Sequence, residues 1–143
     1  MAVPNEGTTA LPSDASGRYF LGRWNGTGFY AQRMTDVFKT VTAQQLKAGG
    51  GGYTLWTPAL GKKWRVLGFS FSVKYDASIY LCDASVSNVS FPTPLIRAGQ
   101  VYTIGGEMGN FGNGVISGLA DRALLLDCSR DTEITGAFWG CEE

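Results

Sequence analysis

A chain of 143 residues, of which 44% are hydrophobic and 13% aromatic, fits one globular domain and is too short for two of ordinary size. Its 12 basic and 12 acidic residues cancel, so it lacks the basic field that drives binding to nucleic acids or anionic membranes. No stretch approaches the roughly 18 apolar residues that a membrane-spanning helix needs. We therefore expect neither a nucleic acid nor a membrane as partner.

The first 17 residues are rich in Pro, Gly, Ser, Thr and Ala and show no apolar periodicity, which predicts a flexible N-terminal arm. They carry no basic segment followed by an apolar stretch, so we do not expect a signal peptide. Residues 18–143 are predicted to form a single β domain. Within it, Asn25-Gly26 is typical of a tight hairpin turn, and Phe29–Gln32 would be the returning strand.

The stretch Met34–Ala48 is the one segment for which a helix is predicted. Its apolar positions fit a helical face imperfectly, and Val and Thr in its middle weaken the prediction: Met34, Val37, Phe38, Val41 and Leu46. Gly49–Gly52 would end such a helix. Residues 18–62 thus form a subregion rich in aromatic residues and glycine, with at most one short helix.

Residues 63–143 are predicted to be the core of the β domain. From Leu67 the sequence alternates, and the apolar positions share one face: Leu67, Phe69, Phe71 and Val73. Further short strands are expected between turn signals, at residues 79–83, 86–91, 100–104, 115–117, 123–128 and 134–139. The predicted fold class is mostly β: an antiparallel β-sandwich or a jelly-roll-like small barrel.

The sequence contains few of the residues that commonly act in catalysis or bind metal ions. The chain contains no histidine, which removes the commonest general base and the commonest zinc ligand. The three cysteines, Cys82, Cys128 and Cys141, are far apart, and reduced buried thiols are the favoured interpretation over one disulfide and a free thiol. We predict no catalytic residue, no cofactor and no metal.

The carboxylates fall at predicted turns and strand ends, where such side chains commonly cap backbone groups. They are Asp76, Asp83, Glu107, Asp121, Asp127, Asp131 and Glu133. Only Glu107, in an apolar glycine-rich loop, is kept as a catalytic candidate. The loop Gly106–Gly114 lacks the lysine and the following helix of a nucleotide-binding loop, and a hairpin with its turn at Asn113-Gly114 explains its glycines.

Aromatic residues crowd the first half of the chain and are the remaining indication of function. Four interpretations compete: core filling, a sugar-stacking platform, a base-stacking platform and a subunit interface. We favour core filling together with an interface, because aromatic residues are enriched at contact cores. The protein-interface candidates are Tyr19, Phe20, Trp24, Phe29, Tyr30, Tyr53 and Trp56.

Two stretches carry a resemblance to a known class of proteins. The first is Lys63-Trp64-Arg65-Val66-Leu67-Gly68, which opens the strand Phe69-Ser70-Phe71-Ser72-Val73. The second is the ending Ile134-Thr135-Gly136-Ala137-Phe138-Trp139-Gly140-Cys141-Glu142-Glu143. Residues 62–143 resemble the capsid decoration proteins (head auxiliary or cement proteins) of tailed bacteriophages, which often end in hydrophobic-x-Gly-x-hydrophobic-x-Gly-x-Glu-Glu. Cys141 stands where a small polar residue is expected.

The resemblance implies a β-sandwich that binds the outer surface of a capsid and stabilises it, often as a homotrimer, with an N-terminal arm that reaches neighbouring subunits. Its partners would be the major capsid protein and copies of itself, and its location the virion, after synthesis in the host cytoplasm. The alternative is a carbohydrate- or receptor-binding module of a phage tail or head fibre, for which Trp24, Tyr30, Tyr53 and Trp56 are the motivation. An enzyme is the third hypothesis and depends on Glu107 alone.

Overall fold

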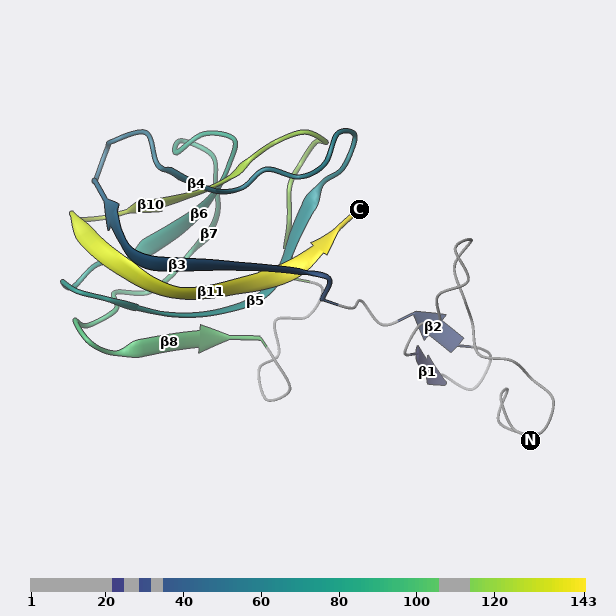
Figure 1. Cartoon of the computed structure of the whole chain (residues 1–143), viewed down its shortest axis with the longest axis horizontal. Helices are drawn as coiled ribbons and strands as arrows, with labels where there is room; N and C mark the ends of the chain where they lie inside the picture. Colours follow the sequence, from purple (N-terminus) through teal and green to yellow (C-terminus); the bar gives the residue numbers. More distant parts are fainter. Residues whose placement is uncertain (1–21, 25–28, 32–34, 106–113) are drawn as a thin grey trace. The chain divides into compact units, whose positions relative to one another are not determined.

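The computed structural model describes residues 22–24, 29–31, 35–105 and 114–143, and the chain divides into two compact units, Met1–Met34 and Thr35–Glu143 (Figure 1). In the first unit, β1 (Gly22–Trp24) pairs antiparallel with β2 (Phe29–Ala31). This confirms the predicted hairpin. Its turn, like residues 1–17, for which a flexible arm is predicted, lies outside the described residues.

The second unit consists of two antiparallel sheets (Figure 1). The larger sheet has the order β3 (Val37–Leu46), β11 (Thr132–Glu142), β5 (Trp64–Val73), β8 (Val101–Ile104), and β9 (Val115–Ile116) also pairs with β5. The smaller sheet has the order β4 (Tyr53–Trp56), β10 (Leu124–Cys128), β6 (Ile79–Asp83), β7 (Val89–Pro92). The described part is therefore a β-sandwich and not a closed barrel, which confirms the predicted fold class.

Apolar side chains from both sheets fill the space between them. At its centre, the Phe69 ring lies 5.4 Å from the Phe71 ring and 5.6 Å from the Phe138 ring, measured between centroids. The Phe91 and Tyr102 rings each lie 5.9 Å from Phe69. Aromatic pairs at these separations contribute to stability beyond the area that they bury.

The alternation along β5 changes phase at Leu67. Trp64 and Val66 are fully buried on one side of this point, and Phe69 and Phe71 on the other. The register with β11 shifts here, since Gly68 pairs with Trp139 and Val66 pairs with Gly140. The extra residue is Leu67, and a β-bulge of this kind moves the following side chains to the opposite face. The predicted inward position of Leu67 is therefore wrong, and this side chain is only half-buried.

The helix predicted for Met34–Ala48 is wrong, because residues 37–46 form β3, a strand of ten residues. Val41 is buried, whereas Phe38 and Thr40 on the other side of the strand are exposed, as expected for a period of two. The β-branched residues at positions 37 and 40–42 favour a strand. Pairing with β11 along eight residue pairs then outweighs the weak helical pattern.

A second bulge interrupts β3. Its register with β11 shifts between Ile134, which pairs with Gln44, and Gly136, which pairs with Val41. Ala43 has a φ of 48°, in the left-handed region, and its amide donates a hydrogen bond of 2.9 Å to Thr135 Oγ1. The regular pairing of β3 with β11 is thus interrupted at Thr42 and Ala43 and resumes at Gln44.

Candidate functional site

The outer face of the larger sheet, which points away from the smaller sheet, carries small and aromatic side chains. One row across four strands consists of Thr40, Ala137, Ser70 and Thr103, in which each residue pairs with the next. The Ser70 and Thr103 hydroxyls are joined by a hydrogen bond of 2.8 Å. A neighbouring row contains Thr135, Ser72 and Val101.

The third row of the outer face is aromatic. Phe38 pairs with Trp139, and Trp139 pairs with Gly68. The Phe38 and Trp139 rings are nearly parallel, with 14° between their planes and 6.4 Å between their centroids. Phe38 is 63% exposed. Gly68 makes room for the indole, because a Cβ there would come within 2.6 Å of three indole atoms.

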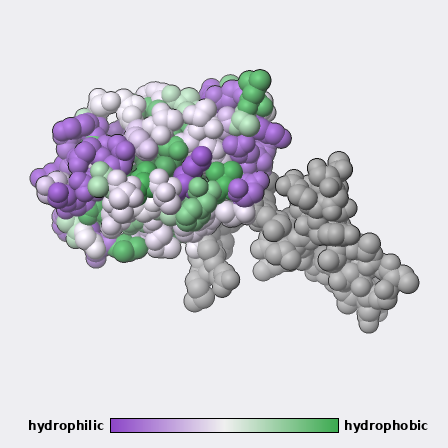
Figure 2. Space-filling view, viewed as in Figure 1, coloured by the Kyte–Doolittle hydropathy of each residue, from purple (hydrophilic) through white to green (hydrophobic). Residues whose placement is uncertain are grey.

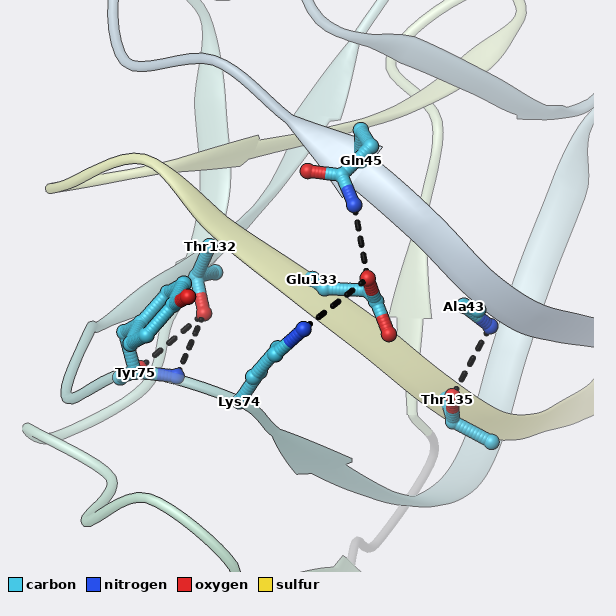
Figure 3. Close-up of polar contacts among 7 residues, drawn as sticks. All are labelled: Ala43, Gln45, Lys74, Tyr75, Thr132, Glu133 and Thr135. Atoms are coloured by element: carbon cyan, nitrogen blue, oxygen red, sulfur yellow. Dashed lines mark hydrogen bonds and ion pairs between the residues drawn. The ribbon is translucent and has the colours of Figure 1, made fainter.

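Polar side chains border the outer face at one end (Figure 3). Glu133 accepts a hydrogen bond of 2.6 Å from Gln45 Nε2, and its carboxylate lies 3.9 Å from Lys74 Nζ. On the core side of the same end, the buried Thr132 Oγ1 accepts a hydrogen bond from the Tyr75 amide and donates one to the Tyr75 carbonyl, each of 3.0 Å. The three rows themselves contain no ionisable acid or base. In Figure 2, the surface between the hydrophilic ends of this unit is mostly intermediate to hydrophobic, coloured white to green.

The cores of protein–protein interfaces are rich in aromatic residues and poor in charged ones, and the outer face has the same composition. A surface without a titratable group offers no general acid or base. We therefore take the outer face as a candidate binding surface rather than as a reaction site.

The structure separates the interface candidates that the sequence suggested. Trp56 is 3% exposed and packs in the core, where its Nε1 donates a hydrogen bond of 3.0 Å to Glu142. Tyr53 is half-buried against the same core. Both therefore fill the core, which is one of the four interpretations of the aromatic residues given above. Trp24, Phe29 and Tyr30 lie in β1 and β2, whose side chains are not described, and Tyr19 and Phe20 lie outside the described residues.

Sequence reasoning did not single out Phe38 and Trp139. Phe38 was assigned to the expected helix, and Trp139 stands beside Phe138 in an expected strand. The alternation itself could have placed Trp139 outward, because the neighbouring Phe138 is apolar and faces the core. Their proximity follows from the pairing of β3 with β11, which no local pattern predicts.

The described Asp side chains mostly hold the backbone, as predicted. Asp76 accepts hydrogen bonds from the Ala98 amide and Arg97, and Asp131 from the Ala48 amide and Lys47. The backbone amide, followed by the basic side chain, lowers the pKa of each carboxyl below its usual value. Asp83 is buried and accepts hydrogen bonds from the Gly118 amide and Arg122. These contacts explain Asp76, Asp83 and Asp131 as structural groups, whereas Asp127 is buried in β10 with one carboxylate oxygen that has no hydrogen-bond partner among the described residues.

Glu107, the single catalytic candidate, lies outside the described residues, as does the rest of the loop 106–113. Among residues 35–105 and 114–143, no three His, Cys, Asp or Glu side chains gather in a way that could hold a metal ion. All three cysteines are buried and none forms a disulfide. Burial, with a smaller contribution from the Asp127 carboxylate, raises the pKa of the Cys82 thiol to about 11.

We expect native Cys82 to react with iodoacetamide far more slowly at pH 8 than the same thiol in urea, because it is buried and protonated. Peptide mapping by mass spectrometry measures this. Since the pKa is raised above the ordinary value of 9.0, the stability that Cys82 contributes is complete below pH 9 and is lost as the pH rises towards about 11. Rapid labelling of Cys82 in the folded protein would contradict this account.

The two stretches on which the expected resemblance to decoration proteins is based lie side by side. Val66 pairs with Gly140 and Trp64 with Glu142. Glu142 accepts hydrogen bonds from Trp56 Nε1 and from the Ala59 amide. Glu143 binds Arg65 through two hydrogen bonds, of 2.7 and 3.1 Å. The Gly-x-Glu-Glu ending thus anchors the last strand to the sandwich.

No family model, curated protein or solved structure matches this chain. Within the described residues, no helix is long and apolar enough to cross a membrane.

Proposed function

We propose that this chain is a non-catalytic structural protein of a virion, which binds the outer surface of a capsid and stabilises it. The observation that carries the proposal is the outer face of the larger sheet, where Phe38 and Trp139 stand exposed or half-exposed among uncharged Ser, Thr and Ala side chains. The resemblance of residues 62–143 to decoration proteins supports a capsid as the partner.

Such a protein stabilises the capsid by binding alone, without catalysing a reaction. A ligand that binds the assembled shell and not its dissociated subunits shifts the equilibrium towards the shell. At a free concentration 100 times the Kd, each occupied site contributes about 2.7 kcal/mol. Many sites on one lattice add to a large total, so weak individual contacts suffice.

The test uses undecorated capsids assembled from the major capsid protein whose gene we expect beside the gene for this chain. We expect saturable binding and a higher disruption temperature of the capsid. Trp139→Ser should weaken binding by roughly 30-fold, because an aromatic anchor at the centre of an interface contributes about 2 kcal/mol or more. Leu119→Ser is the matched control: this side chain is also exposed, at 59%, but lies in a loop.

Failure of the unmodified protein to bind capsids, or the absence of a neighbouring capsid gene, would contradict the capsid as partner. Equal binding by the Trp139 and Leu119 variants would contradict the outer face as the binding surface. Circular dichroism of both variants shows whether they are folded.

The same face supports a second candidate, the binding of neutral glycans. Sugar rings stack on aromatic side chains, and the Thr40 and Thr135 hydroxyls lie on the same face as Trp139. A glycan array incubated with the unmodified protein and the Trp139→Ser variant tests this. Binding that depends on Trp139 supports the candidate, and an array without signal contradicts it.

A further inference from the structure

The exposed edges of the sandwich differ in length. Among the described residues, the edge strands β4, β7 and β8 are four residues long, and β7 ends at Pro92. Short strands and proline are common ways in which proteins prevent edge-to-edge association. β9, which also lies at an edge, has two residues. The long edge of the larger sheet, β3, has ten residues, contains no proline and carries a single charged residue, Lys39. It is the longest of these edges, and its protections are of another kind: Lys39 and the bulge at Ala43. The stretch before the bulge, up to Val41, is the part of this edge that a second strand can join.

Phe38 lies on this edge strand. Trp139 covers one flank of its ring from β11, and the ring remains 63% exposed. A strand added at the free edge of β3 would cover the other flank, because directly opposed side chains in an antiparallel pair lie about 5 Å apart. The incoming strand has to present an apolar side chain at that position.

We propose that two copies of this chain pair edge to edge along β3, antiparallel, with Phe38 of one copy opposite Phe38 of the other. A two-fold axis perpendicular to the sheet keeps both outer faces on the same side. This axis passes midway between the two copies of one β3 residue, which pairs with itself, and that residue is the centre of pairing. The pairing then joins the larger sheets of the two copies into one continuous sheet with a central aromatic row of Trp139 and Phe38 from each copy.

If the two-fold axis lies at another residue of β3, the side chains that face each other across the dimer fit less well. A centre at Val37 places Phe38 opposite the charged Asp36. A centre at Lys39 places two ammonium groups opposite each other, which is destabilising. A centre at Thr40 extends the pairing to Ala43, where the bulge interrupts the strand.

With Phe38 at the centre, the seven residues Thr35–Val41 pair, and each of their opposed pairs is compatible. Asp36 faces Thr40, and Val37 faces the aliphatic stem of Lys39. Seven residues span about 23 Å of edge, which is a small interface. The zero net charge of the chain adds no overall repulsion. We therefore expect a weak dimer, with a Kd in roughly the micromolar range or above.

This inference does not depend on the proposed function, since the dimer forms without a capsid. A dimer presents its two outer faces on the same side, so one dimer can bind two sites on a capsid at once. A dimer also differs from the homotrimer that the resemblance implies, and sedimentation distinguishes the two.

The test is sedimentation equilibrium of the full chain over a wide concentration range. Thr40→Asp places two carboxylates opposite each other at two symmetric positions and should raise the dimer Kd about fivefold or more. Thr40→Lys places a lysine opposite Asp36 of the other copy, twice, and should lower the Kd by a similar factor. Both effects should shrink in about 1 M salt, where screening is strong. Thr40 is exposed, so neither substitution should unfold the chain.

Cysteine cross-linking tests the centre of pairing. Phe38→Cys should give a disulfide-linked dimer under mild oxidation, whereas Thr40→Cys should not, because Thr40 faces Asp36. A protein that remains monomeric at all concentrations would overturn the proposal. So would an equal weakening by Thr40→Asp and Thr40→Lys, or preferential cross-linking through Thr40→Cys, since both point to a centre at Thr40.

Discussion

Replacing Gly140 with alanine is expected to cost about 3 kcal/mol of folding free energy, a large part of the 5–15 kcal/mol that stabilises a domain. A Cβ at this position would collide with the carbonyl oxygen of Arg65 and would lie 2.9 Å from its carbonyl carbon. Both are backbone atoms of the adjacent strand, so the clash cannot be relieved by a rotamer change. Gly140 sits beside the bulge at Leu67, where β5 approaches β11 closely.

Urea denaturation followed by circular dichroism measures this effect. Gly118→Ala is the control, because a Cβ there meets Asp83 Oδ2 at 3.4 Å, an ordinary contact distance, and the expected change is within about 1 kcal/mol. Equal stability of the Gly140→Ala variant and the unmodified protein would contradict the close approach of the two strands.

Phe138→Ala is the second substitution with a large expected effect, a loss of about 3–5 kcal/mol. The Phe138 ring is buried and lies 5.6 Å from both Phe69 and Phe71, so its removal leaves a cavity between the sheets. The midpoint of urea unfolding should fall accordingly.

Phe38→Ala provides a matched control, because it removes the same side chain from the exposed side of the larger sheet. Its loss should change the unfolding free energy by less than about 1 kcal/mol at concentrations where the chain is monomeric. If both variants lost the same stability, the assignment of the two faces would be wrong.

The sequence predicted the sandwich because alternation reports which face of a strand is buried. Phe69, Phe71 and Val73 face the core as their spacing indicates. Leu67 does not, since a bulge depends on the partner strand and leaves no local signal. The strand β3 was mistaken for a helix for a related reason. Its local pattern is ambiguous, and its conformation is decided by the pairing with β11.

The candidate binding surface was harder to predict than the fold. Phe38 and Trp139 are about 100 residues apart in the sequence and meet through the register of two strands. Trp56 looked equally suited to an interface, but its neighbours close over it and Glu142 binds its indole N–H. Composition shows that aromatic residues are present and does not show which of them reach the surface.

Two consequences of the proposed surface are separable. Binding to a capsid depends on Trp139 and its uncharged neighbours, whereas self-association depends on the edge of β3. Thr40→Asp should weaken the dimer and hence bivalent attachment, but it also places a charge on the outer face, where Thr40 lies. The Trp139→Ser variant therefore gives the cleaner separation of the two effects. A Trp139→Ser variant should dimerise and yet bind the capsid weakly.

Hydroxyl-radical footprinting of the capsid-bound and free protein tests whether the outer face of the larger sheet is the capsid-binding surface. This assignment of the binding surface predicts that Trp139 is oxidised in the free protein and protected on the capsid, while Leu60, which is 92% exposed in a loop, stays reactive in both. Protection of the loop residues with Trp139 still reactive would contradict it.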